Sequence, residues 1–272
     1  MQGQIRLYFW AAAIAAVCFL AMPLTPRAHA AGIGQLGILD TSGVNPNTGF
    51  EWAIGDEYRL TFISSARVNP TDNSFGSLDD IATWNAFAQS FADNSDQNLR
   101  GVSWMIIGST TRVDAKDNTR TNPVVNGSGH PIMLIDGSTV IANNYADLWD
   151  GRIQNTITLT EKRGLTIRDA DPPGFPYTGS LSDGTGLTAS EVLRSVSGKQ
   201  KIRQGQADDA VGGIDRNANG PPAKDNIPLS IYAMSEPLSV MVEGPTVTDE
   251  IPEVSSALLI GLAGLALLRR RR

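Results

Sequence analysis

The chain has 272 residues, 41% of them hydrophobic, so it is long enough to bury one substantial core. Its formal net charge is -6 at pH 7, and several of its arginines lie in the two ends, so the middle is more acidic still and nucleic acid is not expected as a partner. The one cysteine, Cys18, lies in the N-terminal apolar run, which excludes disulfides and thiolate metal sites from an exported core.

The first 30 residues have the pattern of a secretory signal peptide. Arg6 precedes an apolar run at 7–22, and Ala28-His29-Ala30 supplies the small residues of a cleavage site. We predict a signal at 1–30 that signal peptidase removes after Ala30. An uncleaved membrane anchor is the alternative, although the apolar run is short for a span.

Three strands are predicted in the core, and a less regular segment precedes them. Residues 31–51 are rich in Gly, Ser, Thr and Asn, which indicates a spacer or an edge strand before a core at 52–245. Residues 57–63 alternate polar and apolar side chains, as a strand with two different faces does. An apolar run at 102–107 predicts a second strand, and residues 227–234 predict a closing strand.

A helix is predicted between the first two core strands. Apolar residues recur at helical spacing from 78 to 92, and Ser77-Leu78-Asp79-Asp80 resembles a capping box at its start. The apolar side of this helix carries Trp84 and Phe87. We interpret this aromatic stripe as core packing and not as a ligand site.

The best specified local unit is a hairpin followed by a helical turn. Two short apolar runs flank Asp136-Gly137, a dipeptide typical of tight turns, and predict strands at 132–135 and 140–142. Asn143 or Asn144 can cap the helical turn that follows.

This helical turn carries part of a candidate ligand surface. Asp147 and Asp150 flank Trp149, which would combine two carboxylates with a ring on which a sugar could stack. The Gly-rich loop around Asp183 is the other part of that surface. The alternative is that Asp147 caps the local turn and that Trp149 fills the core.

A candidate calcium loop lies further along the chain. Asp215, Asn217 and Asn219 place oxygen side chains at alternate positions before Gly220, as in the first half of a calcium loop. The twelfth position is Asn226, where a bidentate glutamate is usual. Calcium is therefore a candidate ligand beside the alternative of a polar surface turn, and no other cofactor is expected.

Residues 246–272 have the composition of a sorting tail. Pro252 and Glu253 precede an apolar run at 257–268, and four arginines follow at 269–272. The tail resembles the PEP-CTERM sorting signal of Gram-negative bacteria, with Val254 in the place of the second proline. The resemblance implies recognition by an exosortase, removal of the short transmembrane helix, and delivery to the outer surface or extracellular matrix. A permanent single-pass anchor is the alternative.

The core from about 52 to 240 resembles the endostatin-like and C-type-lectin-like group of secreted bacterial domains. The residues that carry this resemblance include Trp84-Asn85-Ala86-Phe87, Val102-Ser103-Trp104, Val113-Asp114-Ala115, Pro131-Ile132, Asp136-Gly137, residues 142–151, Thr178-Gly179 and Asp183-Gly184-Thr185-Gly186. The resemblance implies an α+β fold of helices, small antiparallel sheets and long loops that present a binding surface. The zinc and heparin sites of endostatin are not carried over, because His130 is the sole histidine after the signal and the core is acidic.

These patterns predict a non-catalytic, exported surface or matrix module that binds polysaccharide or another envelope protein. Nucleophilic catalysis has little support, because no cysteine would survive export and His130 is the one imidazole left to act as a base. A pair of carboxylates can hydrolyse glycosides without histidine. A secreted hydrolase acting on cell-surface glycan is therefore the alternative function.

Overall fold

The fold was analysed in a computed structural model that describes residues 32–68, 79–95, 98–165, 175–187, 191–193, 201–202, 204–206, 209–211, 213–215, 223–224 and 228–243. All of them belong to one compact unit, which spans Ala31–Arg272. The predicted signal at 1–30, the sorting tail at 246–272 and Ser77 of the predicted capping box lie outside the described residues. Within the described ranges, no helix has the length and apolar character needed to cross a membrane.

A seven-stranded sheet is built around strand β2, Glu57–Ile63. One edge of β2 pairs antiparallel with β9 (Leu238–Val242) and then with β8 (Tyr232–Ser235). The other edge pairs parallel with β4, Ile132–Leu134. The remaining strands of the sheet are β1 (Gly32–Gly34) beside β9, β3 (Trp104–Ile106) beside β8, and β5 (Val140–Ala142) beside β4.

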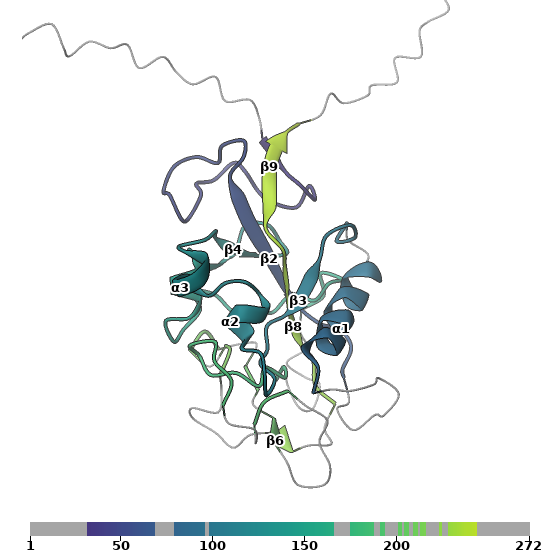
Figure 1. Ribbon diagram of the computed structural model, residues 1–272. Helices are drawn as coiled ribbons and strands as arrows, with labels where there is room; N and C mark the ends of the chain where they lie inside the picture. The colour runs from purple at the N-terminus through teal and green to yellow at the C-terminus, as the bar shows by residue number, and fades with distance from the viewer. Residues whose placement is uncertain are drawn as a thin grey trace, which may run out of the picture. The chain divides into compact units, whose positions relative to one another are not determined.

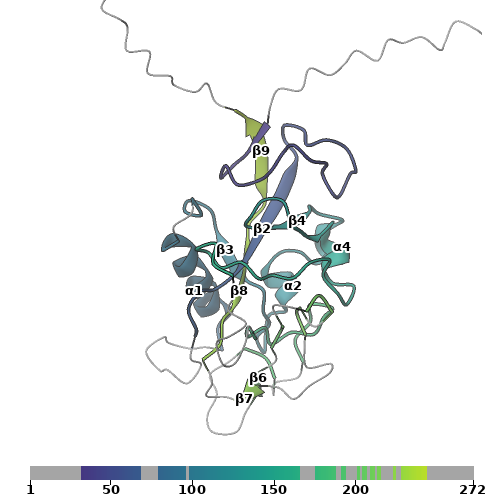
Figure 2. The same cartoon turned by 180° about the vertical axis from the view of Figure 1, so that it is seen from behind.

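The chain is therefore mixed α/β, with a mainly antiparallel sheet and few helices, as the predicted class requires at this coarse level. The helices are α1 (Ile81–Asp93), α2 (Ala115–Asn118), α3 (Pro123–Asn126) and α4 (Tyr145–Leu148). Figures 1 and 2 show α1 on one side of the line formed by β2 and β8, and α3 and α4 on the other side. A separate two-stranded sheet pairs β6 (Lys201–Ile202) with β7 (Ala223–Lys224).

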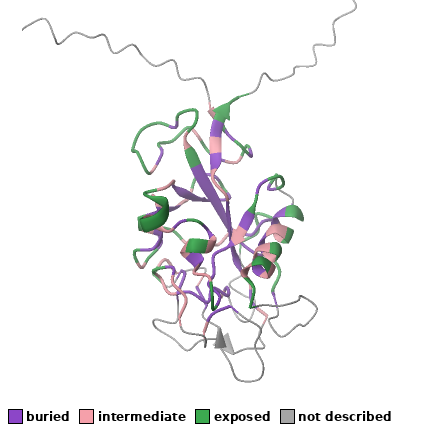
Figure 3. Ribbon diagram, viewed as in Figure 1, coloured by how far each residue is buried: buried purple, intermediate pink, exposed green. Residues whose placement is uncertain are grey.

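Both faces of β2 are buried from Tyr58 to Ile63, and Figure 3 shows the central strand coloured as buried over most of its length. Leu60 and Phe62 belong to a core that includes Trp84 of α1, and Ile63 belongs to a second core with α4. The predicted alternation is thus confirmed, but the second face also buries Arg59 and Thr61. A strand in this position needs a partner for each buried polar group.

The predicted helix is confirmed, with a start at Ile81 in place of 78. Asp80 has extended backbone angles and its side chain accepts the Ala82 amide at 3.0 Å, so it is the residue that caps α1. Trp84 is fully buried, which confirms that the aromatic stripe is core. Two polar side chains of α1 also complete β3: Asn85 Oδ1 accepts the Ile106 amide and Gln89 Oε1 accepts the Trp104 amide, each at 2.9 Å.

The predicted hairpin is confirmed as β4 and β5, which pair Ile132 with Ala142. Gly137 has a φ of 78°, and a Cβ there would lie 1.9 Å from the Ile38 carbonyl oxygen, so the turn requires glycine. The preceding Asp136 accepts the amides of Ser138 and Thr139 at 3.0 and 2.9 Å.

The two ends of the core differ in part from the sequence prediction. The segment predicted as a spacer or an edge strand supplies edge strand β1. The predicted closing strand at 227–234 corresponds to β8 at Tyr232–Ser235, which starts five residues later and ends one residue later than predicted. Strand β9 at Leu238–Val242, which follows Pro237 directly, was not predicted.

Truncation of Leu60 tests the central place of β2. Leu60 is fully buried, whereas Leu165 is 70% exposed, so the same change at the two positions differs only in burial. Leu60→Ala should lower the free energy of unfolding by about 2–5 kcal/mol. Leu165→Ala should change it by less than about 0.5 kcal/mol. Denaturant unfolding measures both, and similar losses in the two variants would contradict the central position of Leu60.

Candidate functional site

The structure brings together the two loops that contain the predicted ligand surface. The helical turn that ends at Trp149 lies against the loop that contains Asp183. A Cβ on Gly184 would lie 2.8 Å from ring carbons of Trp149, and Gly184 has a φ of 79°. The Lys116 amide also donates to the Gly184 carbonyl at 3.3 Å. Helix α2 and the indole ring therefore hold the second loop in place.

Asp147 is used within its own turn. Its amide donates to Asn144 Oδ1 at 3.0 Å, while its carboxylate Oδ2 accepts the Asn143 amide at 2.6 Å and Gln154 Nε2 at 2.5 Å. These bonds are the reciprocal pattern of a capped helix start. The local capping role that the sequence offered as an alternative is therefore present.

Trp149 is buried at 7% exposure in the second core. Its indole Nε1 donates to Thr121 Oγ1 at 2.9 Å, so the polar edge of the ring already has a partner. Stacking on a sugar requires an exposed ring face. In this structure Trp149 supports the candidate surface from beneath and does not present its ring there.

Asp150 and Asp183 are exposed. Asp150 Oδ1 accepts the Arg152 amide at 3.2 Å, and Asp183 Oδ1 accepts the Thr185 amide at 2.9 Å. Partial burial would raise the pKa of Asp183, but hydrogen bonds from Thr185 and the nearby charge of Lys116 outweigh it and hold the pKa below its ordinary value. Asp183 is therefore ionised at neutral pH.

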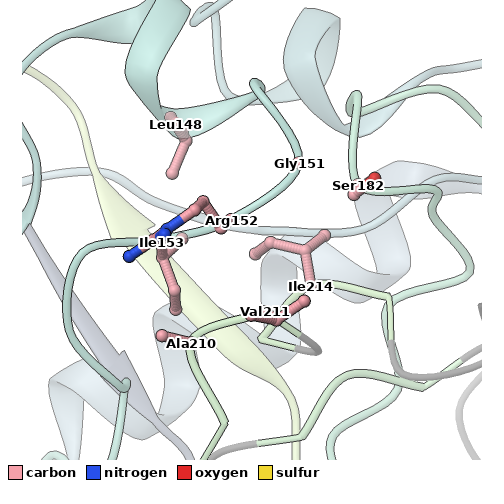
Figure 4. Close-up of a pocket in the computed structure, with 8 residues that line it drawn as sticks. All are labelled: Leu148, Gly151, Arg152, Ile153, Ser182, Ala210, Val211 and Ile214. Carbon is pink, nitrogen blue, oxygen red and sulfur yellow. The ribbon is translucent and has the colours of Figure 1, made fainter. Parts of the chain in front are cut away.

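A shallow hollow that is open to solvent lies between these loops. Three chain segments line it, and Figure 4 shows their residues gathered around it: Leu148, Gly151, Arg152, Ile153, Ser182, Ala210, Val211 and Ile214. Most of the lining is aliphatic, whereas Arg152 is exposed at the surface. The hollow has no room for even one water molecule, so it offers a shallow contact surface to a larger partner and does not enclose a small ligand.

The predicted calcium residues fall only in part within the described chain. Asp215 follows Ile214 of the hollow and is 4% exposed, while Asn217 and Asn219 lie outside the described residues. No cluster of three or more His, Cys, Asp or Glu side chains that could hold a metal occurs in the described ranges. Calcium binding by these residues stays a prediction.

The sequence analysis did not predict a buried polar cluster that is centred on Arg59 and includes Tyr145 of α4. Arg59 is 1% exposed, its Nε donates to Tyr145 Oη at 3.0 Å, and its Nη1 donates to the Ser235 carbonyl at 2.9 Å. Burial lowers the pKa of Arg59, but a guanidinium remains charged in proteins. His130 contacts the Tyr145 ring edge-on and lies 3.2 Å from the Glu57 carboxylate. The available indication was an arginine directly between Tyr58 and Leu60 in a predicted core strand.

No protein-family model matches the chain, and no curated protein matches it.

The candidate site consists of the exposed Asp150 and Asp183, the aliphatic hollow between their loops, and Arg152 at its rim. This combination can contact a partner through charge and apolar surface together.

The His130 environment predicts a pH dependence of stability. Burial lowers the pKa of His130 from 6.5, Glu57 partly offsets this effect, and Arg59 adds to it. The folded state therefore favours the neutral imidazole, and its contribution to stability is complete above pH 6.5 and decreases as the pH falls below that value. The free energy of unfolding of the natural protein should fall relative to His130→Gln between pH 7.5 and 5.5. A constant difference between the two proteins over this range would contradict the prediction.

Proposed function

We propose that the protein is a non-catalytic, exported surface or matrix module that binds polysaccharide or another envelope protein through its loop face. We define the loop face by the candidate site: Asp150, Arg152, Asp183 and the hollow between their loops. The observation that carries this proposal is the convergence of three separate chain segments on one shallow, apolar and charge-rimmed hollow. A shallow surface of this kind suits contact with a large partner.

We also propose that the core adopts a C-type-lectin-like or endostatin-like fold. Its support is the combination of a mainly antiparallel sheet, helices of four to thirteen residues and long connecting loops. Further support comes from the residues that carry the resemblance: Trp84 lies in the core, and residues 142–151 form a strand end, a helical turn and a loop.

The proposed route of export rests on the two ends of the sequence. The pattern at 1–30 supports removal by signal peptidase, and the pattern at 246–272 supports recognition by an exosortase through Pro252 and Glu253. In this proposal the C-terminal apolar run holds the protein in the membrane, either until processing or permanently. The core then lies at the outer surface or in the extracellular matrix.

Binding to a glycan array and to immobilised envelope proteins tests the loop face. Replacing Asp150 and Asp183 with Asn together with Arg152→Gln should weaken binding at least about tenfold, which corresponds to about 1.4 kcal/mol. Arg163→Gln is a matched control, because Arg163 is exposed and does not line the hollow. Equal binding by the triple variant and the natural protein would contradict the proposed surface.

The same glycans should be followed for hydrolysis. We expect no turnover from a binding module. Turnover by the natural protein that one Asp or Glu replacement abolishes would overturn the non-catalytic proposal in favour of a secreted hydrolase of cell-surface glycan.

Calcium binding has its own test. If Asp215, Asn217 and Asn219 hold the ion, saturating calcium should raise the melting temperature by roughly 5 °C or more. The double variant Asn217→Ala and Asn219→Ala should lose this rise, whereas Asn155→Ala, an exposed asparagine elsewhere, should keep it. The absence of any rise in the natural protein would exclude a stabilising calcium site.

A further inference from the structure

Exposed apolar side chains gather at the end of the sheet where β1 meets β9. Phe50 is 76% exposed and Val242 61%, values far above those of ordinary core residues. Figure 3 shows exposed residues at the tip of β9 and along the loop that follows β1. We define the apolar rim as Ile33, Val44, Phe50, Ile54, Met241 and Val242.

Hydrogen bonds join the segments that carry the rim. Ile33 lies directly opposite Met241 in the β1–β9 pair, and the Gly55 amide donates to the Val240 carbonyl at 2.8 Å. The Asn45 amide donates to the Phe50 carbonyl at 2.7 Å, and Asn45 Nδ2 donates to Asp56 Oδ2 at 3.1 Å. The rim is therefore one connected part of the fold.

The rim is also the place where the rest of the chain joins the core. Gly32, the first described residue, lies opposite Val242, the residue before the last described one. Thirteen residues, 244–256, separate β9 and Glu243 from the apolar run at 257–268 and its arginines. This connection spans at most about 45 Å even when fully extended.

The distribution of charged residues at this end of the core favours an apolar partner. No Lys or Arg occurs at 32–57 or in β9, while Asp40, Glu51 and Glu243 carry acidic groups there. Two copies of this end would bring like charges together, which disfavours self-association. Anionic headgroups would be repelled for the same reason, so attraction to this end must come from its apolar side chains.

We propose that the apolar rim docks on the phospholipid bilayer that holds the C-terminal apolar run. The inference rests on the proposed anchoring of the protein by that run. Tethering raises the effective concentration of the rim at the bilayer to the millimolar range, so a few partly inserted side chains suffice for docking. The docked core meets the membrane through the rim, which shares no residue with the loop face.

Fluorescence of the chain without its predicted signal, residues 31–272, in phosphatidylcholine vesicles tests the docking. This chain has no cysteine of its own, and Phe50→Cys carries an environment-sensitive fluorophore. Val125→Cys is the control, because Val125 is 73% exposed on α3 and outside the rim. The label at 50 should shift to the blue and be quenched by lipids with spin-labelled acyl chains, whereas the label at 125 should show neither effect. Adding Ile54→Ser and Met241→Ser should reduce quenching at 50 several-fold.

Vesicle flotation separates the possible failures. A chain that floats with vesicles while the label at 50 stays in water would overturn rim docking and leave the anchoring intact. A chain that does not float would overturn both. Stronger quenching on anionic vesicles that disappears in high salt would replace apolar docking with charge adsorption. A concentration-dependent shift without vesicles would identify a second copy as the occupant and overturn the proposal.

Discussion

The structure depends on the burial of one cation, the Arg59 guanidinium, at the centre of the sheet. Removing a charge from water is costly unless hydrogen bonds replace the lost solvent. Arg59 obtains them from the Tyr145 hydroxyl and the Ser235 carbonyl, and its guanidinium carbon lies 5.3 Å from the centroid of the Tyr145 ring. These bonds therefore fix the positions of β2, β8 and the start of α4 relative to one another. Because α4 carries the loop with Asp150, the same bonds position the loop face.

Local sequence was sufficient to predict those elements whose backbone conformation is determined by a few adjacent residues. Asp136-Gly137 predicted the hairpin, and the pair Asn143 and Asn144 predicted a capped helical turn, in which the structure selects Asn144, because each acts within a few residues of itself. The partner of Arg59 was not predictable in this way, since Tyr145 is 86 residues away. The start of α1 was placed three residues too early because the capping-box pattern begins at Ser77, whereas Asp80 has extended backbone angles and accepts the Ala82 amide.

The candidate site was predicted in part. The sequence predicted a ligand surface on these two loops, but it did not show that Gly184 lies on the Trp149 ring or that the segment before Asp215 lines the hollow. These contacts join residues far apart in the chain, and a single sequence without periodicity in its loops gives no indication of them. Trp149 illustrates the difference: a ring between two acids indicated a sugar platform, whereas its hydrogen bond to Thr121 fixes it in the core.

The way α1 covers β3 affects how the protein behaves when many copies of it lie close together. The outer amides of a terminal strand can template the addition of another chain, which is a route to fibrous aggregates. In this protein Gln89 and Asn85 already occupy the Trp104 and Ile106 amides, and Asn118 Nδ2 donates to the Ile106 carbonyl at 2.8 Å. Side chains thus occupy the positions where another strand would add, so crowded copies of the protein can lie side by side without polymerising through this edge.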